Sequence, residues 1–156
     1  MSLISSDSIE GCSLRLCNVF GHLLSSQKND RGILDKVYNR CLEGQPIEIL
    51  GSGNFYRDYV HVNDVVDAIH HTILNRRVLN GTINYIGSGN AISLKEAFSI
   101  VRSIAMLKVS RKSKFKYTGV PSDINKIHLR NFKADIQDFS SLTGWFPKIG
   151  LEKLNE

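Results

Sequence analysis

The stretch RDYVHVNDVVDAI, residues 57–69, decides the fold class of this chain. Residues 56–62 are rich in aromatic and β-branched side chains, a composition that favours a β-strand. The residues that follow predict a helix, with Asn63 or Asp64 as the N-cap because either side chain can accept a hydrogen bond from the first turn. A strand that runs directly into a helix is the repeating unit of α/β domains.

The flanking segments continue this alternation, so the predicted fold class is α/β. The expected strands are residues 14–19, 46–50 and 82–86, and the expected helices are residues 33–42, residues 135–142 and one opened by a capping box at residues 93–96. Residues 22–31 are expected to form a polar loop, and a strand is expected before Ala134. In the helix after residue 63, the expected buried stripe is Val65, Ile69 and Ile73.

The cysteines and the hydropathy restrict the function classes. Cys12, Cys17 and Cys41 are an odd count without a C-x-x-C pair, which fits a reducing cytoplasm and argues against a disulfide framework or a zinc site. The histidines add no metal-ligand pattern, so no metal is expected. The N-terminus lacks the features of a secretory signal, and no apolar run reaches the ~20 residues of a membrane span. We therefore expect a cytoplasmic protein without a membrane partner.

The net charge of +5 is compatible with an anionic partner. Much of this charge lies in residues 108–116, KVSRKSKFK, which could be a nucleic-acid patch or a solvated loop. Phe115 is the only ring in this stretch that could stack on a base. We therefore favour the solvated loop and expect no nucleic-acid partner.

Two motifs of dinucleotide-dependent redox enzymes have no match in the sequence. Gly51-x-Gly53 leads into a strand, and Gly87-x-Gly89 has Ile92 where a third glycine would stand, so neither fits a pyrophosphate-binding turn. None of the five tyrosines is followed four residues later by a lysine, the pair in which an ammonium lowers the pKa of a tyrosine base. No catalytic residue is assigned, and the chain alone is expected to be inactive.

Residues 57–69 nevertheless closely resemble the RD(F/Y)(V/I)(Y/H)VxDVVxAI signature of extended short-chain dehydrogenases, which include UDP-sugar 4-epimerases and nucleotide-sugar 4,6-dehydratases. Four further segments resemble that family's motifs in the same order: LRLCNVFG at 14–21, PIEILGSG at 46–53, NYIGSG at 84–89 with ISL at 92–94, and AD at 134–135 with TGWFPK at 143–148 and LE at 151–152. Asn84 and Tyr85 stand in swapped order. One such block is a weak signal, and five in order are a strong one.

The resemblance implies, over residues 14–156, the C-terminal substrate-binding lobe of such an enzyme plus the last strands of a Rossmann-type parallel sheet. Residues 1–13 would be an N-terminal remnant or a cloning scar. The parent enzyme would use NAD or NADP to oxidise C4 of a nucleoside-diphosphate sugar, acting as an isomerase or a lyase, while this part alone would bind no cofactor. The expected partners are the nucleotide sugar, the missing N-terminal cofactor-binding half and further copies of the protein.

The substrate-binding residues are also implied by the resemblance. Arg57 matches an arginine that clamps the nucleotide diphosphate, a role suited to a planar fork of donors, with a surface salt bridge as the alternative. Asn18 matches an asparagine that hydrogen-bonds the phosphate or the sugar, with a strand-end turn residue as the alternative. The family's Arg-x-x-Asp clamp falls on Asn125 and His128, a departure for which Arg130 is the expected substitute.

Four apolar or thiol side chains complete the expected site. Leu34 and Leu50 would flank the nucleotide base, and Leu16 and Cys17 would contact the nicotinamide end of the cofactor. Core packing is the alternative for all four.

Asp58 and Asp64 are interpreted as structural residues. A cut through a shared core would also leave an exposed apolar face, expected at Leu14, Leu16, Val19 and Ile86. The rival function is a non-catalytic nucleotide-sugar-binding or assembly module. The sequence leaves open the base, the sugar, NAD or NADP, and epimerase, dehydratase or reductase.

Overall fold

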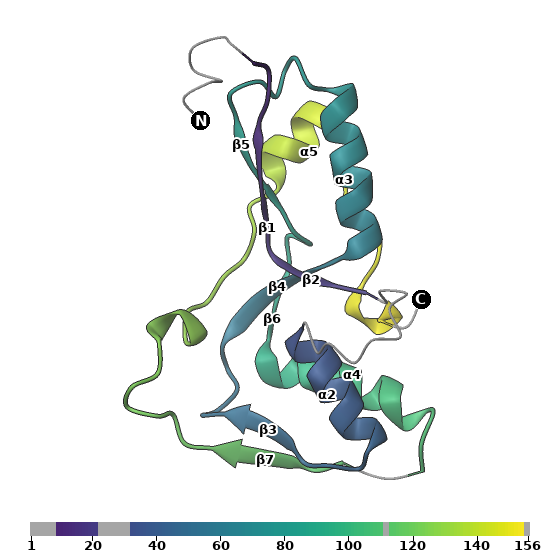
Figure 1. The fold of residues 1–156 in the computed structure, drawn as a ribbon, viewed down its shortest axis with the longest axis vertical. Coiled ribbons are helices and arrows are strands. Elements are labelled where there is room, and N and C mark those ends of the chain that lie inside the picture. The colour runs from purple at the N-terminus through teal and green to yellow at the C-terminus, as the bar shows by residue number, and fades with distance from the viewer. Residues whose placement is uncertain (1–8, 22–31, 111–112, 155–156) are drawn as a thin grey trace. The chain divides into compact units, whose positions relative to one another are not determined.

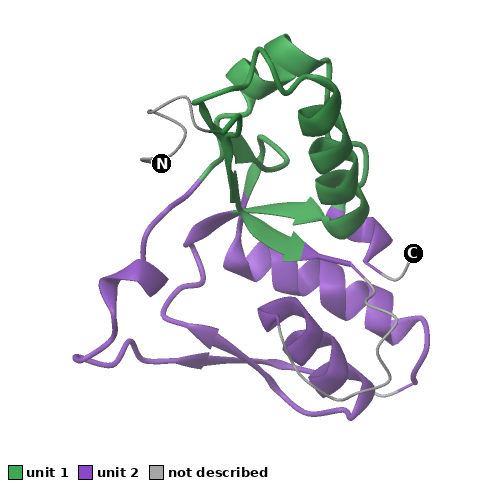
Figure 2. Cartoon of the chain, turned by 45° about the horizontal axis from the view of Figure 1, so that its top comes forward, with its two compact units in different colours: residues 1–19, 58–91, 133–150 green, residues 20–57, 92–132, 151–156 purple. Residues whose placement is uncertain are grey.

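The computed structural model describes residues 9–21, 32–110 and 113–154, so the expected loop at residues 22–31 lies outside the described residues. The chain forms two compact units that are interleaved in sequence, as Figure 2 shows by colour. Unit 1 comprises residues 1–19, 58–91 and 133–150, and unit 2 comprises residues 20–57, 92–132 and 151–156. Residues 9–13 were expected to belong to an N-terminal remnant. They belong to unit 1, where Gly11 N donates to Asn80 Oδ1 at 2.9 Å.

Unit 1 is built on two parallel strands. Strand β1 (Ser13–Leu16) pairs in parallel with β5 (Ile83–Ile86), and helices α3 (Val62–Leu74) and α5 (Gln137–Thr143) belong to the same unit (Figure 1). Its buried core consists of Val60, Val65, Ala68, Leu79, Ile86, Phe139 and Trp145. The rings of Phe139 and Trp145 meet edge to face at 5.5 Å. Gly144, with φ of 72°, ends α5 where the sequence predicts a stop.

Helix α3 begins differently from the prediction. Its N-cap is His61, whose Nδ1 accepts a hydrogen bond from Asn63 N at 3.2 Å, so the assignment of the cap to Asn63 or Asp64 was wrong. The carboxylate of Asp64 instead accepts hydrogen bonds from Lys148 N at 3.1 Å and Ile149 N at 3.0 Å. The cap differs because a distant segment, rather than the first turn of the helix, uses this carboxylate.

The buried face of α3 is also narrower than predicted. Val65 is buried, but Ile69 and Ile73 are 46% and 60% exposed, so the expected stripe was wrong beyond its first residue. Residues 64, 65 and 68 form the buried face. This buried face is rotated about the helix axis from the expected stripe, because it includes the buried carboxylate of Asp64.

Unit 2 pairs two helices with two parallel strands. Helices α2 (Ile33–Leu42) and α4 (Leu94–Met106) pack together, and β3 (Ile47–Leu50) pairs in parallel with β7 (Phe115–Thr118). Two 3₁₀ turns, η1 (Lys126–His128) and η2 (Leu151–Lys153), complete it. The capping box is confirmed at its N-cap, because Ser93 Oγ accepts from Glu96 N at 3.1 Å.

Strand β7 was missed by the sequence analysis. It takes up the end of the basic stretch at residues 108–116, which was expected to be a loop, and residues 111–112 of that stretch lie outside the described residues. Phe115 is covered by the guanidinium of Arg102, 4.4 Å from the ring centroid, so the ring is not presented for stacking on a base. The strand expected before Ala134 is replaced by irregular backbone that follows η1.

Three short strands form the remaining sheet. The strands β2 (Asn18–Phe20), β4 (Tyr56–His61) and β6 (Ala91–Ser93) lie in the order β2-β4-β6, and the boundary between the units falls within each of them. The predicted strand at residues 14–19 is thus divided into β1 and β2 at Cys17. The parallel pairs and the alternation of strands with helices confirm the α/β class.

The apolar face predicted in unit 1 is present in part. Leu16 and Val19 are 47% and 42% exposed and Leu14 is half-buried. Ile86 is fully buried in the core, so including Ile86 in the exposed face was wrong.

None of the helices in the described part of the chain is long and apolar enough to cross a membrane.

The contacts of Asp64 generate a stability prediction. Asp64→Ala should lower the free energy of unfolding by about 2–4 kcal/mol, because two partly buried N–H groups lose their acceptor. Asp67→Ala, one turn along α3, is the matched control: its carboxylate pairs with the exposed Lys148 ammonium at 3.2 Å, a contact worth about 0–1 kcal/mol. Urea unfolding of both variants beside the parent measures the difference. Equal losses in the two variants would contradict the assignment.

Candidate functional site

The carboxylate of Asp58, in β4, is fully buried in unit 1 and surrounded by hydrogen-bond donors. Its Oδ1 accepts from the main-chain N and the hydroxyl of Ser88, each at 2.7 Å. Its Oδ2 accepts from Gly89 N at 3.1 Å and Ala134 N at 3.0 Å. Four donors replace the water that a buried carboxylate loses, so the group stays satisfied inside the protein.

A glycine allows the chain to approach this carboxylate closely. A Cβ atom at Gly87 would lie 2.4 Å from Ala134 Cβ, which is too close for any side chain, and 3.0 Å from Asp58 Oδ2, which is a tight contact. Gly89 has φ of 71°, a left-handed conformation that turns the backbone so that its N–H reaches the same carboxylate. The Gly-Ser-Gly sequence at residues 87–89 therefore serves a protein carboxylate in this unit.

Cys17 and Asn18 are joined to the same residue. The Cys17 thiol lies 3.5 Å from Asp58 Oδ1 and donates to it. Burial, followed by the charge and the hydrogen bond of Asp58, raises the pKa of the Cys17 thiol far above its ordinary range, so the group stays protonated at neutral pH. Asn18 Nδ2 donates to Asp58 O at 2.8 Å, while the residue as a whole is exposed. Its Oδ1 accepts no hydrogen bond from the part of the chain that the structure describes.

Four of the five sequence blocks singled out by resemblance therefore meet at one buried residue. Residues 14–21 contribute Cys17 and Asn18, residues 84–89 contribute the Ser88 and Gly89 donors, and residues 134–135 contribute Ala134 N, all around Asp58. Asp64, in the same stretch as Asp58, binds the segment after Trp145. The interpretation of both carboxylates as structural agrees with these contacts.

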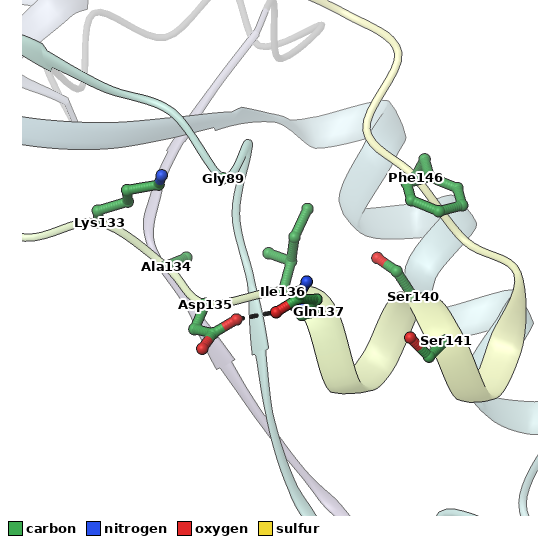
Figure 3. A pocket seen from close by; sticks show the side chains of 9 residues that line it. All are labelled: Gly89, Lys133, Ala134, Asp135, Ile136, Gln137, Ser140, Ser141 and Phe146. Carbon is green, nitrogen blue, oxygen red and sulfur yellow. Dashed lines mark hydrogen bonds between the residues drawn. The ribbon is translucent and has the colours of Figure 1, made fainter.

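A pocket of about 740 Å³ lies in unit 1 beside this network (Figure 3). It is lined by Gly89, Lys133, Ala134, Asp135, Ile136, Gln137, Ser140, Ser141 and Phe146. Asp135 Oδ1 accepts from Gln137 N at 3.1 Å, and the buried Ser140 Oγ has no hydrogen-bond partner among the described residues. None of the predicted binding residues lines this pocket, and no sequence signal pointed to it.

Unit 2 places Arg57 in an environment of main-chain oxygens. Its Nη2 donates to His128 O at 2.7 Å and to Ile127 O at 3.3 Å, and its Nη1 donates to Tyr56 O at 2.9 Å and to Arg130 O. Arg57 and Arg130, predicted separately, are thus brought together through the backbone of the second residue. The salt bridge considered for Arg57 is not among these contacts, which are all to carbonyl oxygens.

The positions expected for the family's second clamp have structural roles in unit 2. Asn125 caps η1, because its Oδ1 accepts from Ile127 N at 3.0 Å. His128 is exposed and contributes its carbonyl oxygen to Arg57. Arg130 is exposed as well, and its guanidinium lies 5.6 Å from the centroid of the Phe132 ring.

The apolar residues proposed for the base and the cofactor differ in their accessibility. Leu34 is only 4% exposed, on the core side of α2, whereas Leu50 is half-buried at the end of β3. Leu16 is exposed at the end of β1. Leu16 and Leu50 therefore offer more surface to a ligand than Leu34 does. No group of three or more His, Cys, Asp or Glu residues in the described ranges could hold a metal ion.

Parallel strands, a helix that crosses between them and a glycine turn at the end of β5 define an α/β protein of the Rossmann-like type. A sequence model of the NAD dependent epimerase/dehydratase family matches residues 2–87, more than half of the 156 residues. The chain belongs to the NAD-dependent epimerase/dehydratase family.

Individual relatives agree with this family and differ in activity. The chain is 30% identical to a putative UDP-glucose 4-epimerase of Methanocaldococcus jannaschii over 93% of its own length, and 27% identical to a dTDP-4-dehydro-6-deoxyglucose reductase of Escherichia coli over 91%. It spans 43% of the length of each. The UDP-glucose 4-epimerase of Thermotoga maritima, solved with UDP-glucose, has the same fold, with a TM-score of 0.75 and 23% identity over 94% of this chain and 44% of that one.

The raised pKa of Cys17 predicts its reactivity, because the thiolate is the nucleophile. At pH 8, iodoacetamide should label Cys17 roughly tenfold or more slowly than Cys12, whose pKa is raised by burial alone. Labelling of Cys17 should continue to accelerate as the pH rises above the ordinary range of thiols. Peptide mass spectrometry of the native chain measures both rates. Equal rates for Cys12 and Cys17 at pH 8 would contradict the contact with Asp58.

Proposed function

We propose that this chain is the nucleotide-sugar-binding part of an NAD-dependent epimerase or dehydratase. The observation that carries the proposal is the meeting of four family sequence blocks at the carboxylate of Asp58, in a chain that belongs to this family. Because these blocks bind one another, the residues that carry the resemblance form one connected network in this chain. The named relatives act on nucleotide sugars, which supports the same substrate class here.

Several residues are proposed to contact the substrate, and each is taken within its own unit. In unit 1, the exposed amide of Asn18 has an oxygen available to accept a hydrogen bond from a sugar hydroxyl. In unit 2, Arg57 and Arg130 supply positive charge for the diphosphate, and Leu34 and Leu50 supply apolar surface toward the base, Leu50 the more accessible of the two. Interactions with the nucleotide would position the sugar carbon for reaction.

The residues proposed for the cofactor fit its nicotinamide end alone. Leu16 exposes an apolar side chain and Cys17 keeps a neutral thiol, both compatible with an uncharged ring. Bound NAD would accept the hydride from the sugar. In the two glycine turns, Gly51 N, Gly53 N and Gly89 N already donate to Thr118 O, Leu50 O and Asp58 Oδ2, so they are not available to a pyrophosphate. The pyrophosphate site and the tyrosine base would belong to a cofactor-binding half outside this sequence.

The exposed edge of unit 1 supports such a second half. Within the described residues, β1 pairs with β5 alone, and parallel sheets are normally buried on both faces. Leu16, Val19 and Ile83 are each more than two-fifths exposed around these strands. Covering them with further parallel strands would remove apolar surface from water.

The decisive test is turnover with and without the upstream half. The chain alone, given NAD and UDP-glucose or dTDP-glucose, should yield no epimerised or dehydrated product, because the sequence lacks a tyrosine base and a pyrophosphate turn. The protein expressed with its natural upstream coding sequence should yield product, detected by chromatography of the sugar nucleotides. Product from the chain alone would refute the proposal that the cofactor site and the tyrosine base belong to a separate half. An inactive longer protein that still binds the nucleotide would favour the non-catalytic module.

The exposed strand edge predicts association of the isolated chain. Light scattering should show oligomers that Leu16→Lys combined with Val19→Lys dissociates, since two charges on the apolar face oppose its burial. Leu107→Lys is the matched control, because Leu107 is 87% exposed and belongs to unit 2, whereas Leu16 and Val19 belong to unit 1. A strictly monomeric parent would contradict this interpretation of the face.

A further inference from the structure

The pocket in unit 1 shares no residue with the sites that the proposed function uses. Its volume of about 740 Å³ falls within the ~300–1,000 Å³ of small-molecule sites. Its lining comes from Gly89 and from residues 133–146, which all belong to unit 1. The residues proposed for the nucleotide and the cofactor are absent from this lining. A ligand in the pocket would therefore be held by residues that have no role in the proposed function.

One buried hydroxyl that lines the pocket lacks a hydrogen-bond partner. Ser140, in α5, is only 6% exposed, and its Oγ has no partner among the described residues. Helical hydroxyls commonly donate to the carbonyl oxygen four residues earlier, as Ser99 and Ser103 do in α4 and Thr143 does in α5 itself. Ser140 does not make this bond. An unpaired buried hydroxyl is unfavourable, and a well-placed ligand would supply the missing partner.

Other polar side chains of the lining also have unused hydrogen-bonding groups. The side chains of Gln137 and Ser141 make no hydrogen bond within the described residues, and Lys133 forms no ion pair there. Asp135 accepts from Gln137 N with Oδ1 alone, at 3.1 Å, as the dashed line in Figure 3 shows. The pocket therefore offers both donors and acceptors, and the charges of Lys133 and Asp135 offset each other.

Phe146 gives this polar pocket an apolar wall. Its side chain is 60% exposed, although the chain on either side of it is anchored. Trp145 is buried and its Nε1 donates to Asp64 O at 3.2 Å, and Lys148 N donates to Asp64 Oδ2 at 3.1 Å. The ring is thus presented by a fixed segment, and it lines the same pocket as the Ser140 hydroxyl (Figure 3). A site formed in advance loses less conformational entropy when a ligand binds.

We propose that this pocket is a binding site for a hexopyranose sugar. A pyranose ring has a face of C–H groups that can cover the Phe146 ring, and hydroxyls that each donate and accept, which matches the mixed polar lining. A multiply charged anion would find the ammonium of Lys133 offset by the carboxylate of Asp135. A wholly apolar ligand would bury the polar groups of Ser140 and Gln137 without partners. The site goes beyond the proposed function, in which other residues contact the nucleotide sugar.

The site is tested by titrating the chain with D-glucose and with D-galactose and following the amide shifts by NMR. Saturable shifts are expected at Gly89, Gln137, Ser140 and Ser141, with a Kd of about 1 mM or weaker for so few contacts. Glycerol, which has hydroxyls but no ring, and inorganic phosphate should give no saturable shift at these amides. The absence of saturable shifts with both sugars, equal shifts with glycerol, or saturation by phosphate alone would each overturn the proposal.

The apolar wall is tested by Phe146→Ala. This variant should weaken glucose binding roughly tenfold or more, because the sugar loses the surface that its C–H face covers. Leu142→Ala is the matched control, since Leu142 is a 46% exposed apolar residue of α5 that does not line the pocket. It should leave glucose binding unchanged. Equal binding by Phe146→Ala and Leu142→Ala would remove Phe146 from the site and overturn the proposal.

The Ser140 hydroxyl is tested by two measurements that should change in opposite directions. Ser140→Ala should weaken glucose binding roughly three- to tenfold while leaving the urea midpoint of unfolding unchanged or higher, because the hydroxyl it removes has no partner in the protein. Ser99→Ala is the matched control: it gains the same helix propensity, removes a hydroxyl that donates to Lys95 O, and should not affect glucose binding. A lower midpoint with unchanged glucose binding in Ser140→Ala would show a structural hydroxyl and overturn its role in the site.

Discussion

The buried carboxylate of Asp58 is the constraint on which unit 1 depends. An ionised carboxylate without water is strongly unfavourable unless donors replace its hydration. Here the donors come from Ser88, Gly89 and Ala134, residues that are 30 to 76 positions away in sequence. The strand that carries Asp58, the glycine turn after β5 and the segment before α5 are therefore coupled. Gly87 belongs to the same constraint, because a side chain there would collide with Ala134 and crowd Asp58.

Local signals made part of this structure predictable. The bounds of α2 follow from its apolar spacing and from Gly44, whose positive φ of 71° follows the C-terminal end of the helix. The capping serine of α4 and the turn at Gly81 are likewise set by their immediate neighbours. The resemblance identified the blocks that surround Asp58, but it did not reveal the contacts between them. Those contacts require knowledge of which distant N–H groups reach the carboxylate.

The predictions that failed concern residues whose partners are distant. Asp64 suits a helix cap by type, yet its carboxylate binds Lys148 N and Ile149 N, and His61 caps α3 in its place. The sequence of β7 indicates a basic loop. It forms a strand because it pairs in parallel with β3, with Ile47 in register with Phe115. In both cases a long-range interaction outweighs the local preference. The pocket beside Gly89 was unpredictable for the same reason, since it forms where residues 133–146 approach the distant Gly89.

Arg57 and Asp58 are adjacent in the stretch that identifies the family, yet they make different contacts. Successive residues of a strand point to opposite faces, so neighbours in sequence need not share an environment. Asp58 receives its donors from unit 1, and Arg57 donates to oxygens of unit 2. The sequence analysis expects a binding role for Arg57 and a structural role for Asp58, and in the structure both side chains connect segments that are distant in sequence. The carboxylate connects residues 88, 89 and 134, and the guanidinium connects β4 to η1 through main-chain oxygens.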